Sequence, residues 1–162
     1  MNKKIEQDSG KDPVQDPKED LSENLIFSVS ELANVAEGQT DRYDTDTPVS
    51  FDKEGDEDPV KAKSNLKGTI RIMRINREFN IQIHDMEIDV ELECDKCLEP
   101  HIQKIEIPHA EIEFLIKPSQ DIESNEDIFF VNTKNWTVDL NEFIRQEIIL
   151  HFPLISVCST HI

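Results

Sequence analysis

The sequence has no long apolar run, few glycines and no excess of positive charge. Its 162 residues contain no stretch of 18 apolar residues, so we expect no membrane-spanning helix. Only four glycines occur, and they do not form a glycine-rich phosphate loop. Lys and Arg total 17 against 35 Asp and Glu, a formal net charge of −18. Because phosphate-binding proteins normally carry a basic surface, contact with nucleic acid would need a local basic patch or a basic partner protein.

Features of secreted proteins and of enzymes are also missing. Lys3 and Lys4 are not followed by an apolar segment, so we predict no secretory signal and a cytoplasmic location. Three cysteines are an odd number and do not make a disulfide framework. No nucleophile stands beside a base, so neither an enzyme nor a small-molecule substrate is predicted. Four histidines show no catalytic or ligand spacing among themselves: His84, His101, His109 and His151.

Apolar residues are unevenly distributed along the chain. Residues 1–24 contain only four that could enter a core, and two prolines interrupt them. Burial there cannot offset the entropy lost on ordering, so we interpret residues 1–24 as a disordered acidic tail. The domain is expected to span residues 25–162. Within it, residues 39–65 are polar and acidic and predict a long flexible loop, which reaches the core at Tyr43, Val49 or Phe51.

Alternation of apolar and polar residues from Leu66 onward predicts antiparallel strands with one face in solvent. Turns are expected at Asn76 and Pro100. Helical spacing predicts one helix over about 29–37, capped by Ser28 and Glu31, and a second over about 140–151. We therefore predict an α+β fold, an antiparallel β-sheet or partly closed barrel with two short helices. The alternating groups are Ile70 and Ile72, Ile81 and Ile83, Ile88 to Cys94, Ile105 and Ile107, Ala110 to Ile116, and a short strand from Ile128 to Val131.

Two short motifs predict a metal site. Cys94 and Cys97 form C-x-x-C at the end of a predicted strand, and Cys158 and His161 form C-x-x-H 60 residues further on. Three thiolates and one imidazole are the ligand set of a closed, structural zinc site. Thioredoxin-like chemistry would need the C-x-x-C motif at the start of a helix, which the pattern does not show. A thiol redox site and unmetallated thiols remain the alternatives.

One basic run stands out in this acidic chain, and it consists of Lys67, Arg71, Arg74 and Arg77. Lys67 and Arg71 are expected on the same side of one strand, where they could contact a phosphate backbone. They could equally pair with acidic side chains on neighbouring strands. We keep the run as a candidate contact with nucleic acid or with a partner protein.

Three segments together resemble a known family. The sequence LECDKCLEP at residues 92–100 is similar to its C-x-R-C-L-x-P signature, with Lys96 in place of the arginine. Val138-Asp139-Leu140 and EIILHFP at residues 147–153 are similar to a second signature, I-D-L…E-x-I-L-L-x-L-P, which Cys158 follows. IFSVSEL at residues 26–32, with Gly38, fits the family's opening. Residues 25–161 therefore resemble the YceD family, the large ribosomal RNA subunit accumulation proteins of bacteria and plastids.

The resemblance implies a non-enzymatic cytoplasmic factor for 23S rRNA accumulation and ribosome biogenesis. Its expected partner is the large ribosomal subunit precursor, contacted through ribosomal protein or rRNA. A net charge of −18 favours a basic ribosomal protein or an assembly intermediate over naked rRNA. The alternatives are a zinc-stapled interaction module without a ribosomal role, or a thiol redox protein that uses Cys94 and Cys97.

Overall fold

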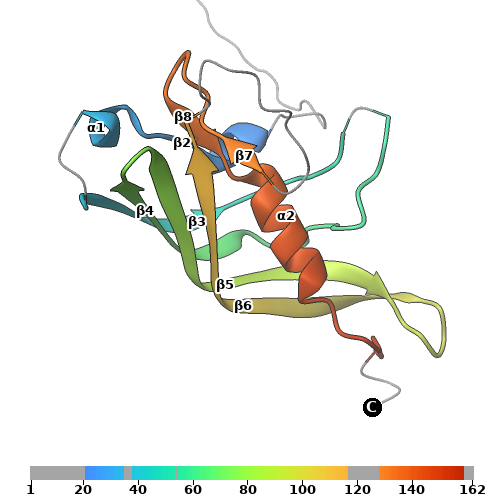
Figure 1. Cartoon of the computed structure of the whole chain (residues 1–162). Coiled ribbons are helices and arrows are strands. Elements are labelled where there is room, and N and C mark those ends of the chain that lie inside the picture. Colours follow the sequence, from blue (N-terminus) through green and yellow to red (C-terminus); the bar gives the residue numbers. More distant parts are fainter. Residues whose placement is uncertain (1–20, 35–37, 54, 117–127, 159–162) are drawn as a thin grey trace, which may run out of the picture.

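The computed structural model describes residues 21–34, 38–53, 55–116 and 128–158 (Figure 1). The greater part of the predicted N-terminal tail, residues 1–20, and the predicted ligand His161 lie outside the described residues. In chain order the elements are η1 (Ser22–Leu25), β2 (Ile26–Ser28), α1 (Ser30–Ala33), β3 (Thr40–Thr47), β4 (Leu66–Ile75), β5 (Glu78–Glu93), β6 (Pro100–Leu115), β7 (Phe129–Phe130), β8 (Thr137–Asp139) and α2 (Asn141–Leu150).

The strands form two sheets. A five-stranded sheet has the order β3-β4-β5-β6-β7, antiparallel except for the parallel β6–β7 pair. A two-stranded antiparallel sheet pairs β2 with β8. The prediction of an α+β fold with a mainly antiparallel sheet is confirmed, and the described sheet is open rather than closed into a barrel.

Strands β5 and β6 bend together at one corner (Figure 1). The corner divides their hairpin into a near arm, which begins at the β4–β5 turn, and a far arm, which ends at the β5–β6 turn. In the near arm, buried Ile81 and Ile83 of β5 stand on odd positions. In the far arm, buried Met86 and Ile88 stand on even positions, and β6 changes phase opposite them. The β5–β6 register continues unbroken through the corner. Each strand therefore turns its other face inward there, with two consecutive residues pointing outward: His84 and Asp85 on β5, Pro108 and His109 on β6.

The bend is built into the backbone. Asp85 has a φ of 51°, and β5 carries one more residue than β4 between the pairs Lys67↔Glu87 and Thr69↔His84. That extra residue is a β-bulge, which bends its strand and increases the local twist. Gly68 lies against the bulge. A Cβ at this position would stand 2.7 Å from Met86 Cα, so only glycine lets β4 approach β5 this closely.

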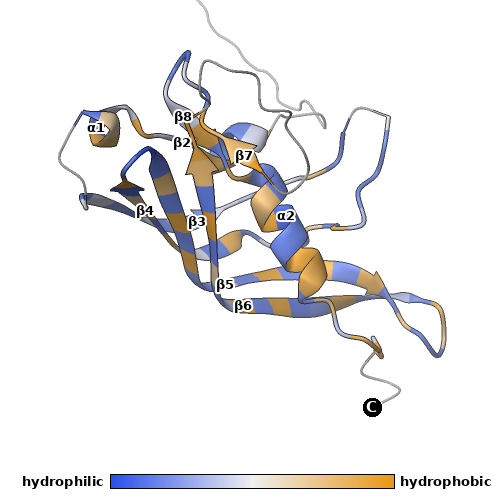
Figure 2. Ribbon diagram, viewed as in Figure 1, coloured by the Kyte–Doolittle hydropathy of each residue, from blue (hydrophilic) through white to orange (hydrophobic). Residues whose placement is uncertain are grey.

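The core lies between the five-stranded sheet and the elements near the two ends of the described chain. Helix α2 packs against β6 and buries Phe143, Ile144 and Ile148. Its opposite face is polar, as the alternating colours along α2 in Figure 2 show. Leu25 is fully buried, and its carbonyl accepts a hydrogen bond from the Leu140 backbone N–H at 2.9 Å. The N-terminal elements thus close the core beside the start of α2.

The predicted loop over residues 39–65 is wrong in its first third, because Thr40–Thr47 forms strand β3. The strand lies at the sheet edge and is half exposed along its length, so its side chains are Thr, Asp, Arg and Tyr rather than aliphatic. Thr and Tyr favour extended backbone, and charges on an edge strand discourage pairing with other chains. The expected contacts of this segment with the core are confirmed: Val49 and Phe51 are buried, and Tyr43 is partly buried against the core.

The helix predictions had different outcomes. The prediction over 140–151 is confirmed by α2, and Asp139 Oδ1 accepts a hydrogen bond from the Asn141 backbone N–H at 2.9 Å. The prediction over 29–37 is too long, since α1 spans only Ser30–Ala33 and residues 35–37 lie outside the described part. No capping box forms, because Ser28 Oγ accepts from the Ser30 backbone N–H at 3.4 Å, one residue too early for the expected cap.

Candidate metal centre

The three cysteines meet at the tip of the far arm. Cys94 follows β5, Cys97 ends the turn toward β6, and Cys158 is brought back by the segment after α2. Their Sγ atoms all lie within 4.8 Å of one another, and Cys97 Sγ is 3.7 Å from Cys158 Sγ. Within the described residues, the fold thus brings three metal-ligating side chains close enough to share one ion.

A tight turn aims the first two sulfurs in one direction. The Leu98 backbone N–H donates to the Cys94 carbonyl at 2.9 Å, and the Cys94 N–H donates to the Glu99 carbonyl at 2.8 Å. Leu98 adopts a φ of 65°, which reverses the chain so that β6 begins at Pro100. The C-x-x-C spacing therefore places Cys94 and Cys97 on the inside of one reversal.

The third cysteine is positioned by hydrogen bonds of the segment that precedes it. The Asp95 backbone N–H donates to the Ser156 carbonyl at 2.7 Å, and the Ser156 N–H donates to Asp95 Oδ2 at 2.6 Å. Ser156 Oγ also lies 2.6 Å from His101 Nε2 on β6. These contacts hold the segment that leads to Cys158 along the turn.

The electrostatics of the cluster favour a thiolate at Cys94. The backbone N–H of Cys158 donates to Cys94 Sγ at 3.4 Å, as does the N–H of Lys96, and with Cys97 they lower the pKa of Cys94 to about 5. At Cys97 a backbone hydrogen bond from Glu99 acts to lower the pKa. Desolvation and the neighbouring sulfurs of Cys94 and Cys158 outweigh it, so the pKa of Cys97 is raised. Thiols this close together resist ionising at the same time, and a bound cation would stabilise their ionised forms.

The three sulfurs fit a zinc ion. Two thiolates that each lie about 2.3 Å from one tetrahedral ion are about 3.75 Å apart, close to the Cys97–Cys158 separation. A bound zinc ion would supply a cross-link between the β5–β6 turn and the segment after α2. The C-x-x-C motif lies between two strands and not at the start of a helix, so the helix dipole that lowers thiol pKa values in thioredoxin-like sites is absent from this turn.

The basic run is split between the two faces of the sheet. Arg71 is exposed and pairs in register with Arg42 and Gln82. Arg74 pairs in register with buried Phe79, and its Nη1 donates to the Ala33 carbonyl at 3.1 Å. Since cross-strand partners share a face, Arg74 supports α1 from the inner side, and the four basic residues do not form one surface.

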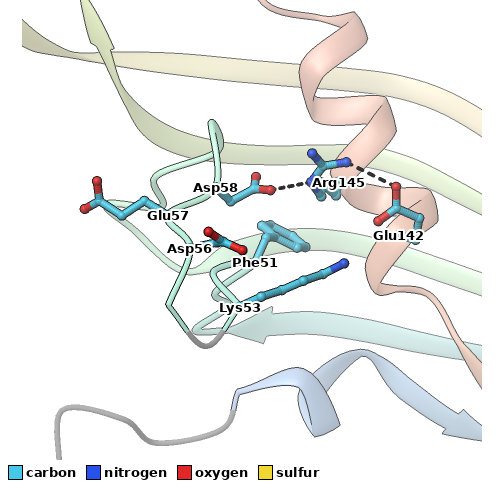
Figure 3. A pocket seen from close by; sticks show the side chains of 7 residues that line it. All are labelled: Phe51, Lys53, Asp56, Glu57, Asp58, Glu142 and Arg145. Carbon is cyan, nitrogen blue, oxygen red and sulfur yellow. Dashed lines mark hydrogen bonds and ion pairs between the residues drawn. The ribbon is translucent and has the colours of Figure 1, made fainter.

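A pocket of about 160 Å³ lies between α2 and the segment after β3 (Figure 3). Charged side chains that line it connect these two parts of the chain. Arg145 Nε donates to Asp58 Oδ1 at 2.6 Å, and Arg145 Nη1 donates to Glu142 Oε2 at 3.1 Å. Asp58 Oδ2 in turn accepts from the Val60 backbone N–H at 2.9 Å. The hydrogen bond that Arg145 donates to Asp58 raises the pKa of Arg145. These contacts give the pocket a structural explanation.

The comparisons with known proteins bear on the C-terminal half of the chain. The family model described as "Large ribosomal RNA subunit accumulation protein YceD" matches residues 84–162. The match begins at the corner of β5 and takes in all three cysteines and α2, so the resemblance to the YceD family is confirmed over this range. No curated protein and no solved structure matches the chain. Among the described helices, none has the length and apolar character needed to cross a membrane.

Proposed function

Starting from the YceD match over residues 84–162, we propose that this protein is a non-enzymatic factor that supports 23S rRNA accumulation during large ribosomal subunit assembly in the cytoplasm. The match is the observation that carries the proposal, because the description of the family names accumulation of the large ribosomal RNA. The metal centre has the role of a structural staple in this proposal, and no residue is assigned to catalysis.

The charge of the molecule supports contact through a basic ribosomal protein. The net charge is −18, and exposed acidic side chains surround the metal centre at Glu93, Asp95 and Glu99. Naked rRNA would be repelled over most of this surface, whereas a basic protein would be attracted to it. Since Arg74 lies on the inner side of the sheet, the exposed basic run is reduced to Lys67, Arg71 and Arg77.

Exposed apolar side chains gather around the metal centre and suggest where the partner docks. Leu98 is 65% exposed directly after the C-x-x-C motif, while Leu154 and Ile155 are 103% and 70% exposed just before Ser156. Leu150, at the end of α2, is 73% exposed, and the orange colour near the C-terminus in Figure 2 marks this region. We call these four residues the C-terminal apolar surface. Apolar side chains exposed beside acidic ones suit a basic protein that contributes an apolar anchor.

The test is co-sedimentation with large-subunit precursors. The wild-type protein should migrate with particles that contain 23S rRNA, and depletion of the protein should lower the 23S rRNA level. Purified protein should bind protein-free 23S rRNA only weakly at physiological salt. Tight binding to protein-free rRNA would contradict the protein contact. Absence from all precursor fractions together with an unchanged 23S level would contradict the function itself.

A pair of matched variants locates the contact. Leu154→Asp places a charge on the C-terminal apolar surface and should release the protein from the precursor. Ile75→Asp is the control, because Ile75 is also exposed but lies at the β4–β5 turn, at the end of β5 away from the cysteines. If both variants remain bound, the docking surface lies elsewhere, although the proposed function would stand.

A further inference from the structure

Two histidines that the sequence gave no reason to pair meet at the corner of the sheet. His84 on β5 and His109 on β6 are cross-strand partners. Their ring centroids are 4.9 Å apart, and His84 Nδ1 lies 3.4 Å from His109 Nδ1. Their neighbours Ile83 and Ala110 are buried, and successive side chains of a strand alternate between faces, so both histidines lie on the face away from the core.

Polar groups next to the outer nitrogens orient the two rings. His84 Nε2 lies 3.1 Å from Gln82 Oε1, which is an acceptor, so His84 Nε2 carries the hydrogen. Gln82 is fixed in this orientation because its Nε2 donates to Asn80 Oδ1 at 3.1 Å. His109 Nε2 lies 3.6 Å from Glu111 Oε1, which favours a hydrogen on that nitrogen too. Glu111 is itself held by Asn80 Nδ2, which donates to its Oε2 at 2.8 Å.

This ring of five side chains turns the two Nδ1 atoms toward each other. In the tautomer with hydrogens on both Nε2 atoms, each Nδ1 presents a lone pair to the other. Two ring nitrogens 3.4 Å apart are joined either by a shared hydrogen or by a metal cation bound between them. Carboxylate or amide oxygens on the outer nitrogens are also the usual way in which proteins orient metal-binding histidines.

We propose that His84 and His109 bind a divalent transition-metal ion through their Nδ1 atoms, at a second site distinct from the cysteine cluster. Two imidazole nitrogens that each lie about 2.0–2.1 Å from one tetrahedral ion are about 3.4 Å apart, as these two are. Imidazole suits Zn²⁺, Ni²⁺ and Cu²⁺, and solvent reaches His109, whose side chain is 52% exposed, so water can complete the coordination. Nine residues of β5 separate His84 from Cys94, and the two sites share no ligand.

The experiment is a calorimetric titration of the full chain with Ni²⁺ after one equivalent of Zn²⁺ has been added to occupy the cysteines. The wild-type protein should bind one Ni²⁺. His84→Gln and His109→Gln should each weaken this binding at least about tenfold, since loss of even an outer partner of a metal ligand has an effect of that size. His151→Gln is the matched control, because His151 is exposed and its Nδ1 lies against the Glu147 carbonyl at 2.8 Å, and it should bind as the wild type does.

A second measurement needs no variant. In nuclear magnetic resonance spectra of the wild-type protein, paramagnetic Ni²⁺ should broaden the imidazole signals of His84 and His109 before those of His101 and His151. Wild-type affinity in either glutamine variant would overturn the proposal. So would broadening that begins at His101, near the cysteine cluster, or that affects all histidines equally.

Discussion

A single arginine connects the longest irregular segment of the described chain to the core helix. The Arg145 side chain is 26% exposed and its partner Asp58 is 10% exposed, so their ion pair is largely shielded from water. Shielded pairs of this kind stabilise the local arrangement, and removal of one partner leaves the other charge without compensation. By contrast, the Arg42–Asp44 pair on β3 has side chains that are 65% and 76% exposed.

We predict that Arg145→Leu lowers the free energy of unfolding by about 2–3 kcal/mol, because Asp58 then keeps a buried charge without its partner. The matched change Arg42→Leu should alter it by no more than about 0.5 kcal/mol, since exposed ion pairs contribute little. Urea denaturation of both variants measures the difference. Equal losses in the two variants would show that the charged side chains of the pocket beside α2 do not stabilise this connection.

The Cys94 thiolate makes the metal-free protein sensitive to pH. Its pKa in the folded chain is about 5, against an ordinary value of 9.0, mainly because of the hydrogen bond from the Cys158 backbone. The stabilisation from a lowered pKa is complete above the ordinary value and is lost as the pH falls toward the folded value. We predict that acidification from pH 8.5 to 6 destabilises the metal-free wild type more than Cys94→Ser.

Urea midpoints at the two pH values, in the presence of a chelator, measure this difference. Cys97→Ser is the control, because the pKa of Cys97 is raised and the backbone donors to Cys94 remain in that variant. It should keep most of the pH dependence of the wild type. A Cys94→Ser protein with the full wild-type dependence would mean that another group titrates over this range.

At the scale of elements, the corner explains what the sequence could and could not predict. The alternation identified Ile81, Ile83, Ile88 and Val90 of β5 and most buried positions of β6, but it missed Phe79 and Met86, which are buried as well. The structure shows unbroken strands that bend, because Asp85 adopts a left-handed conformation that alternation alone does not encode. Cysteines could be predicted to meet from their own spacing, but the contact of His84 with His109 follows from the register, which only the fold provides.

The bulge beside Gly68 gives a prediction for this corner. Gly68→Ala would place a Cβ 2.7 Å from Met86 Cα, a backbone atom that cannot move aside without disturbing β5. We expect the free energy of unfolding to fall by about 3 kcal/mol or more, because the site is overpacked and a φ of 155° is unfavourable for alanine.

Gly55→Ala is the matched control for this prediction. Gly55 also has a positive φ, of 83°, but no heavy atom lies within 4 Å of the added Cβ. Gly55→Ala should therefore lower the free energy of unfolding by only about 1 kcal/mol, the effect of the backbone conformation alone. Thermal unfolding of the two variants compares them, and a Gly68→Ala protein as stable as Gly55→Ala would show that β4 and β5 can separate at the bulge without penalty.

At the scale of the whole molecule, the three cysteines bring together two segments near the two ends of the matched region. The segment from His151 to Cys158 follows α2 and is held on the β5–β6 turn by Ser156 and Cys158, with large exposed side chains between them. A sheet with continuous hydrogen bonds should keep its structure when this attachment is lost, whereas a segment with few contacts should not.

We therefore predict that a chelator raises hydrogen exchange of residues 151–158 well before that of β5 and β6. Cys97→Ser should show the same raised exchange without chelator, and its zinc-to-protein ratio should fall below the value of about one that we expect for the wild type. His161→Ala should have the smaller effect, because water replaces a terminal imidazole more easily than a thiolate at the turn. Simultaneous loss of protection in the segment and the sheet would contradict a local role of the metal.

The corner also limits how this hairpin can change in length during evolution. Because β5 and β6 keep one register through the bend, a residue deleted from one strand alone would misalign every pair beyond it. One residue deleted from each strand of the far arm would restore the pairing, but it would turn Ile88 and Ile105 toward solvent and the C-x-x-C turn away from Cys158. Only paired insertions or deletions of two residues per strand preserve both faces, so homologues that keep the cysteines should differ in far-arm length by multiples of four residues.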